Sequence, residues 1–235
     1  MPKQRIILAI FLLSLAINAT GMMANFSLLA LPALLAGWYV ADFASGMIHL
    51  YMDYRPCPPG RKLDELFFYA GSRESPEYAE LFRTRMAAVS PLERLVYDFK
   101  NHHPRPWALG RRPVWRLIGS TVIVAALPLS LGMNLLTIAT PVPSWVSAFF
   151  VSFITGGAFA QYFHGTLHRL ENPWFIDAMR KVGLLMAPEA HQLHHDTLQR
   201  DFATNCGWSN PLINPLFRAL RSRGYLDDAG LVPSA

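Results

Sequence analysis

The chain has 235 residues, of which 52% are hydrophobic and 16% charged, with a formal net charge of +5 at pH 7. A basic balance suits nucleic-acid binding, but the sequence carries no nucleic-acid fold signature and no basic strip interleaved with aromatic residues. The basic excess instead lies beside long apolar stretches, where it fixes orientation in a bilayer and meets anionic headgroups. Composition therefore predicts a membrane protein without a nucleic-acid partner.

Two long stretches, residues 6–40 and 117–168, contain no lysine, arginine or acidic residue. At about 20 residues per span, each holds two helices joined by a turn. We expect spans at 6–22, 26–50, 115–138 and 144–168, with turns near 21–25 and 141–143. The alternative for the first run is a cleaved signal peptide, but no small-x-small site precedes a polar start. The expected fold is all-α and polytopic, with residues 1–235 forming a single domain.

Basic residues predict the orientation of these spans. The two turns carry none, whereas Lys3 and Arg5 precede the first span and residues 54–113 hold eleven basic against seven acidic residues. The positive-inside rule then makes both termini and the parts 51–114 and 169–235 cytoplasmic. Cys57 and Cys206 would be reduced there. Every histidine also falls on this side, as part of a cytoplasmic histidine-rich helical cap.

Several shorter helices are expected in the cap. Ser90-Pro91-Leu92-Glu93 reads as a capping box with proline at the first helical position, and this helix would end at His102-His103. Ser75-Pro76-Glu77 opens another helix, through about residue 86. Further helices are expected near 174–185, 190–197 and 215–223, and no strand is convincing.

The histidines carry the chemistry. All eight fall into four short groups: His49 with Asp53, His102-His103, His164 with His168, and His191 with His194 and His195. Residues three or four apart share a helix face, so each helical group would project toward one point. The neighbouring side chains of His102 and His103 diverge by about 100° around a helix. Either they reach different irons, or one of them only hydrogen-bonds to a ligand without binding the metal. These nine side chains are the predicted metal ligands, and the eight histidines the predicted catalytic residues.

The number of ligands indicates the metal. A zinc ion takes three or four protein ligands, so eight imidazoles are too many for one ion but suit two irons, which implies oxygen chemistry. Stepping back along the helices from His49 and His164 by helical intervals gives small residues, expected to serve packing, together with the polar residues Asp42 and Gln161. An acid inside a span is a functional candidate. Asp42 is expected to orient His49 through a hydrogen bond, and Gln161 to do the same for a neighbouring imidazole.

These motifs resemble those of the Kua-type lipid desaturases. Residues 42–53 (DFASGMIHLYMD) resemble the family motif DFxSGxxHxxxD. Four more segments resemble family motifs: residues 99–106 the motif FxxHHxxP, residues 164–168 the motif HxxxH, residues 191–195 the motif HxxHH, and residues 205–212 the motif GWxNxPL. The resemblance covers about residues 38–218 in the same order. Leu50 and residues 165–167 lack the family's usual tryptophans, Ala190 replaces a histidine of the animal members, and the insert at 54–95 is long. The ligands are intact, while the last motif is closer to the plant form.

The resemblance implies a di-iron enzyme that uses O2 and external electrons to desaturate a membrane lipid. Animal members are plasmanylethanolamine desaturases and plant relatives desaturate an acyl chain of phosphatidylglycerol. A site at the cytoplasmic boundary would reach bonds near the glycerol, so the first expectation is conversion of an alkyl ether phospholipid to a vinyl ether (plasmalogen). An acyl-chain desaturase and a di-iron lipid hydroxylase are the alternatives. No dinucleotide or haem motif is present, so electrons would come from a carrier such as a cytochrome b5 or a ferredoxin.

Other classes use histidine in membranes. A b-type cytochrome would hold haem between spans, but four of the ligands lie in loops and HxxHH is poor for haem. A divalent-metal transporter would put ligands near the midplane, whereas the outer halves of these spans are apolar. An intramembrane metalloprotease would need HExxH, which is absent from the sequence.

Overall fold

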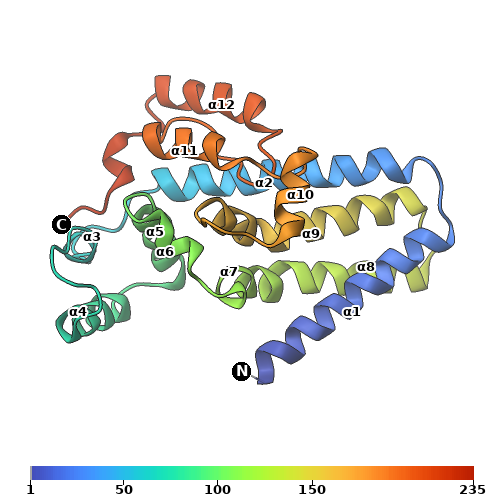
Figure 1. Ribbon diagram of the computed structural model, residues 1–235, viewed down its shortest axis with the longest axis horizontal. Helices are drawn as coiled ribbons and strands as arrows, with labels where there is room; N and C mark the ends of the chain where they lie inside the picture. Colours follow the sequence, from blue (N-terminus) through green and yellow to red (C-terminus); the bar gives the residue numbers. More distant parts are fainter. Residues whose placement is uncertain (1) are drawn as a thin grey trace.

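The computed structural model describes residues 2–235, and within this range the regular structure is entirely helical. Four helical segments are long and apolar enough to cross a membrane: α1 (Pro2–Ala24), α2 (Ala30–Tyr54), the continuous run α7 (Val114–Thr121), η1 (Val122–Ala126) and α8 (Leu127–Ala139), and α9 (Ser144–Leu167). They lie side by side as a bundle (Figure 1). The all-α fold and the number of spans agree with the sequence prediction.

The ends of the spans differ from the predicted ones by a few residues. α1 continues through Gly21 to Ala24, and α2 begins at Ala30 instead of residue 26 and runs on to Tyr54. Apolarity shows which residues can sit in lipid, but hydrogen bonding decides where a helix stops. At the end of α2 the ammonium of Lys100 donates to the carbonyls of Met52 and Asp53, which satisfies two terminal acceptors. The fourth span ends at Leu167, one residue before His168.

A π-helical turn, η1, interrupts the third span immediately before Leu127 and Pro128. Proline lacks an N–H and its ring crowds the preceding turn, and a widened turn accommodates both effects. Further along, Ser130 Oγ lies 2.8 Å from Ser14 Oγ, and the Asn134 amide donates to Ser14 Oγ at 2.8 Å. This buried polar network joins α8 to α1.

α2 and α9 pack closely because small residues line their contact. A Cβ on Gly37 would lie 2.2 Å from the Phe149 carbonyl oxygen, and one on Gly156 would lie 2.7 Å from Ala41 Cβ. Small residues of this kind let membrane helices approach closely. The two helices that carry His49 and His164 are therefore held together along their length. The packing role expected near the ligands also applies to Gly46, whose Cβ would lie 2.6 Å from Ile213 Cδ1, whereas Gly157 faces open space.

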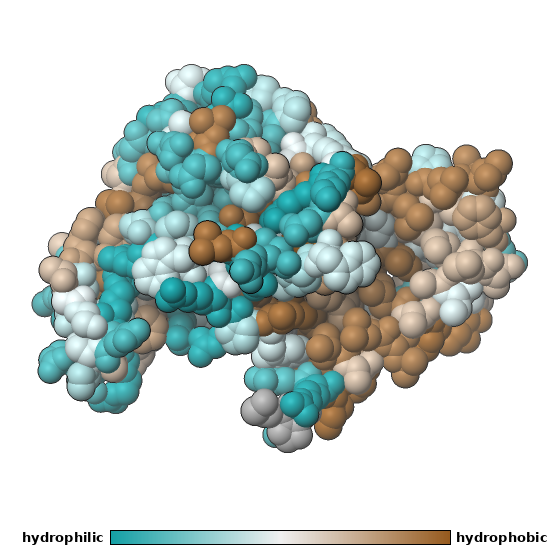
Figure 2. Space-filling view, viewed as in Figure 1, coloured by the Kyte–Doolittle hydropathy of each residue, from teal (hydrophilic) through white to brown (hydrophobic). Residues whose placement is uncertain are grey.

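The remaining helices gather at one end of the bundle and make a polar cap. They are α3 (Asp64–Phe67), α4 (Pro76–Ala87), α5 (Pro91–His102), α6 (Pro106–Gly110), α10 (Trp174–Lys181), α11 (Pro188–Thr197), α12 (Asn210–Ser222) and η2 (Asp228–Leu231). Figure 2 shows hydrophilic residues over this end and hydrophobic residues over the far ends of the spans. Leu28, Leu135 and Ile138, which lie at or near the far ends of the spans, are among the exposed apolar side chains.

The predicted helix starts in the cap are confirmed at Ser75 and at Ser90, where both bonds of the capping box form. Two other predictions need correction. α10 stops at Lys181 and not near residue 185, because Gly183 adopts a left-handed conformation (φ +75°) and ends the helix. α12 begins at Asn210, five residues before the expected start, with Pro211 in its first turn and Pro215 inside it.

Candidate metal centre

Eight histidines and Asp53 meet where the polar end of the bundle joins the cap. They come from the ends of α2, α5 and α9 and from α11, so elements distant in sequence build one site. Their ligand atoms form two groups, and within each group all lie within 4.8 Å of one another. The five-histidine cluster contains His102, His164, His168, His191 and His195, and the carboxylate cluster contains His49, Asp53, His103 and His194.

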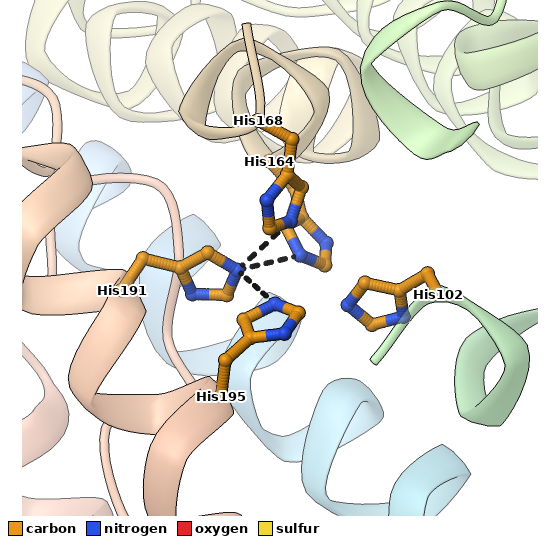
Figure 3. A group of neighbouring side chains, drawn as sticks. All are labelled: His102, His164, His168, His191 and His195. Carbon is orange, nitrogen blue, oxygen red and sulfur yellow. Dashed lines mark hydrogen bonds between the residues drawn. The ribbon is translucent and has the colours of Figure 1, made fainter. Parts of the chain in front are cut away.

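In the five-histidine cluster the imidazole nitrogens converge on a common space (Figure 3). His191 Nε2 lies 3.0 Å from His164 Nε2 and 3.1 Å from the Nε2 atoms of both His168 and His195. His102 points into the same space from α5, and its Nε2 has no partner. Two ligands at right angles with bonds of about 2.1 Å are about 3.0 Å apart, so these separations fit a metal ion.

The carboxylate cluster is built around Asp53. Its oxygens lie 3.3 Å from His49 Nε2, 3.5 Å from His103 Nε2 and 3.5 Å from His194 Nε2. Asp53 is completely buried, and neither carboxylate oxygen accepts a hydrogen bond within residues 2–235. A buried anion without a partner is strongly unfavourable. A metal cation between this carboxylate and the three imidazoles would remove that cost.

Backbone carbonyl groups orient three of the imidazoles. His49 Nδ1 donates to the Phe202 carbonyl at 2.9 Å and His194 Nδ1 to the Arg200 carbonyl at 2.7 Å, while His102 Nδ1 donates to the Phe99 carbonyl. A carbonyl only accepts, so the proton sits on Nδ1 and each Nε2 keeps a free lone pair. Hydrogen bonds of this kind fix the tautomer and ring orientation of metal-binding histidines.

The electrostatic environment favours neutral imidazoles. Burial lowers the pKa of His103 and His168 to about 3 and that of His195 to about 4, mainly because the charged form loses its hydration. The pKa values of His102 and His191 are also lowered well below the usual value for the same reason. Neutral imidazole is the form that binds metal ions. Donor type, spacing and protonation state therefore all fit two metal ions.

The structure favours one of the two alternatives left open for the adjacent pair His102-His103. His102 joins the five-histidine cluster and His103 the carboxylate cluster, so the two side chains reach different sites. The expectation that His191, His194 and His195 share one point was wrong. His194 and His195 are also neighbours on a helix and diverge by about 100°, so His194 lies in the carboxylate cluster while His191 and His195 remain together.

The expected role of Asp42 also needs correction. Its carboxylate makes no bond to His49 and instead accepts from the backbone N–H groups of Cys206, Gly207 and Ser209 and from the Ser209 hydroxyl, at 2.6–3.1 Å. Asp42 therefore fixes the loop between α11 and α12 to α2. Gln161 lines a cavity next to His164 and, among residues 2–235, makes no hydrogen bond to an imidazole.

Sequence reasoning missed the groups that support the ligands. The carbonyls of Phe202 and Arg200 have no sequence signature, because every residue carries one. Lys100 is completely buried and donates to the Asp53 carbonyl, next to the carboxylate cluster. A lysine two positions before a histidine pair was the only available sign of this contact.

Comparison with known proteins agrees with the geometry. The model of the lipid desaturase domain family matches residues 92–222, more than half of the chain. A plasmanylethanolamine desaturase from Myxococcus xanthus is 25% identical over 213 residues, which cover 87% of this chain and 63% of that protein. The chain thus spans less than two thirds of the length of this relative. No solved structure matches the chain.

The family match and the four apolar helices together describe an integral membrane protein. The match includes seven of the eight histidines, since only His49 lies before residue 92. The resemblance to the Kua-type lipid desaturases is therefore confirmed, and the matched residues include all of its motifs except the one at residues 42–53. The chain belongs to the lipid desaturase family, whose members are oxidoreductases that act on lipids.

Proposed function

We propose that this protein is a membrane di-iron lipid desaturase, with one iron held by each cluster. The observation that carries the proposal is the buried carboxylate of Asp53 facing three imidazoles, beside a second group of five converging imidazoles. Imidazole with some carboxylate suits iron, and neither group contains a thiolate. Two bound irons supply, with O2 and two electrons, the oxidising power to remove hydrogen from an unactivated chain.

The residues of the chain have distinct tasks in this proposal. Carbonyls of Phe202, Arg200 and Phe99 keep the Nε2 lone pairs of three histidines directed at the ions. Asp53 supplies the only negative charge among the nine ligand side chains, which places more negative charge at one ion than at the other. Burial of Asp53, His49 and His194 keeps bulk water away from the carboxylate cluster.

The proposed substrate is a membrane phospholipid modified near its glycerol end. The clusters lie at the polar ends of α2 and α9. In a bilayer spanned by these helices, such ends would lie at the depth of the glycerol and first chain carbons and not at the bilayer centre. The Myxococcus relative is named for action on a plasmanyl ether lipid. Conversion of an alkyl ether to a vinyl ether is the first choice, and acyl-chain desaturation and hydroxylation are the alternatives.

The source of electrons is proposed to be a separate carrier protein such as a cytochrome b5 or a ferredoxin, docking on the side of the cap. By the positive-inside rule this side is cytoplasmic. Arg200 and Arg218 line a surface depression there, and the Arg200 carbonyl is the group that bonds His194. Basic surfaces of this kind favour an acidic partner.

The imidazole spacing argues against the cytochrome alternative. Two axial histidines lie on opposite faces of a porphyrin, whereas here His191 Nε2 lies only 3.0–3.1 Å from the Nε2 atoms of three other histidines. A haem between them would have no room.

Lipid mass spectrometry tests the function. Cells that express the chain and receive an alkyl ether phospholipid should form a product two mass units lighter and cleaved by acid. His191→Ala should abolish this product, while Gln192→Ala, an exposed neighbour on α11, should retain it. An acid-stable product two mass units lighter would indicate desaturation of an acyl chain, and a product sixteen mass units heavier would indicate hydroxylation. No change in any lipid, with folded iron-loaded protein and a supplied electron donor, would contradict the proposal.

A further inference from the structure

One cavity opens directly onto the five-histidine cluster. It has a volume of about 420 Å³, within the range of small-molecule sites, and lies between α5, the segment from α6 to α7, and the end of α9. His102 and His164 form part of its wall. Any lipid chain that reaches the cluster through this cavity meets these two histidines.

The buried and the exposed parts of the cavity wall differ in character. The buried part includes Leu109 and Leu117, which are 6% and 3% exposed. The more exposed part, which we call the mouth, includes Arg94 and Arg116, together with the half-buried Arg112. An apolar interior with a basic mouth is complementary to an amphiphile that has an anionic group beside its chains.

The charge at the mouth is only partly balanced. Asp98 pairs with Arg112 at 3.5 Å, so three arginines and one carboxylate leave a formal excess of two positive charges. Within residues 2–235, neither Arg94 nor Arg116 has a carboxylate within 4.0 Å. Arg94 is held by stacking, with its guanidinium 5.6 Å from the centre of the Phe82 ring, which leaves its N–H groups available.

The cavity also lies at the polar ends of the spans. Arg116 is the third residue of the third span, and His164 lies three residues before the end of the fourth span, so both belong to the polar boundary of the bundle. At this boundary a phospholipid presents its phosphate, with the glycerol and the first carbons directly beneath it.

We propose that this cavity binds one phospholipid molecule, with Arg94, Arg112 and Arg116 around its phosphate and the first carbons of one chain against His102 and His164. Guanidinium groups recognise phosphate oxygens through paired hydrogen bonds. The proposal rests on the proposed function only for what happens to those carbons. It adds that the phosphate sets the depth of the chain and therefore the bond that reaches the site.

A binding measurement separates this proposal from the reaction. The full-length, iron-loaded protein in an uncharged detergent is titrated with 1-alkyl-2-acyl-glycerophosphoethanolamine or with the corresponding 1-alkyl-2-acylglycerol, and bound lipid is counted by native mass spectrometry. Arg94→Gln and Arg116→Gln should each weaken phospholipid binding by roughly fivefold, since each removes one phosphate contact. Neither should change binding of the phosphate-free lipid.

Arg111→Gln is the matched control. Arg111 lies beside Arg112 but stacks on Trp107, with its guanidinium 4.9 Å from the ring centre, and does not line the cavity. Its replacement should leave both affinities unchanged. Four results would each overturn the proposal. Arg111→Gln could lose as much affinity as the other variants, the phosphate-free lipid could lose as much affinity as the phospholipid, or no variant could lose affinity. The fourth is displacement of the bound lipid by an equal concentration of inorganic phosphate. Arginine-dependent binding without any product would refute the proposed function and leave this inference standing.

Discussion

Replacing Asp42 by asparagine is expected to detach the loop between α11 and α12 from α2. The carboxylate accepts four hydrogen bonds, from three backbone N–H groups and the Ser209 hydroxyl, and it is completely buried. The same loop supplies the Phe202 carbonyl that accepts from His49 Nδ1. Asp42 therefore acts on the metal centre through the fold and not by touching a ligand.

The magnitude follows from the number of bonds. Asparagine keeps one oxygen and turns an amide N–H toward N–H donors, so about two of the four bonds are lost. A bond to a charged group contributes about 1.5–3 kcal/mol, which gives a loss of at least about 3 kcal/mol in unfolding free energy. At about 2–4 °C per kcal/mol, the melting temperature should fall by roughly 6–12 °C. Ser209→Ala removes one bond and should cost about half as much.

Thermal unfolding in detergent, with and without iron, measures both effects. Asp42→Asn should melt earlier than Ser209→Ala even without metal, and its iron content should fall because His49 loses its orienting loop. Unchanged melting of the metal-free Asp42→Asn variant, together with loss of iron, would refute the reasoning. That result would mean that Asp42 acts directly on the metal site.

Three further changes test other contacts. Gly37→Ala should strongly impair folding, because its Cβ would lie 2.2 Å from a carbonyl oxygen of α9, while Gly157→Ala, with open space around it, should melt normally; equal melting of the two would contradict the packing. Asn134→Leu should lower the unfolding free energy, measured by thermal unfolding, by about 0.6–2 kcal/mol, since it breaks the hydrogen bonds between α1 and α8. An unchanged unfolding free energy would show that these hydrogen bonds do not stabilise the bundle. Asp53→Ala should lose about one iron per chain by elemental analysis, because the carboxylate cluster loses its only anion; full iron content would exclude Asp53 as a ligand.

Features that depend on local sequence were predictable. Charge-free runs gave the four spans, and the serine caps before α4 and α5 gave the starts of those helices. The grouping of His49 with Asp53 and that of His164 with His168 follow from helical spacing alone. These predictions succeed because hydrophobicity, capping and spacing act within a few residues.

Features that depend on distant contacts were not predictable. The 100° turn between neighbouring residues separates His194 from His195, but only the three-dimensional arrangement shows that two sites lie there to receive them. The sequence predicts a hydrogen bond from Asp42 to His49 on the same helix. The hydrogen-bond donors to the Asp42 carboxylate instead lie 164 to 167 positions away in sequence. The start of α12 was ambiguous because Pro211 and Pro215 each suit a first turn.

Anomalous scattering at the iron absorption edge, from crystals of the iron-loaded protein, is the most direct test of the central claim. The account predicts two iron peaks per chain. One should lie among the imidazoles of the five-histidine cluster, and the other between Asp53 and the imidazoles of His49, His103 and His194. A single peak per chain, or iron bound elsewhere while both clusters stay empty, would contradict it.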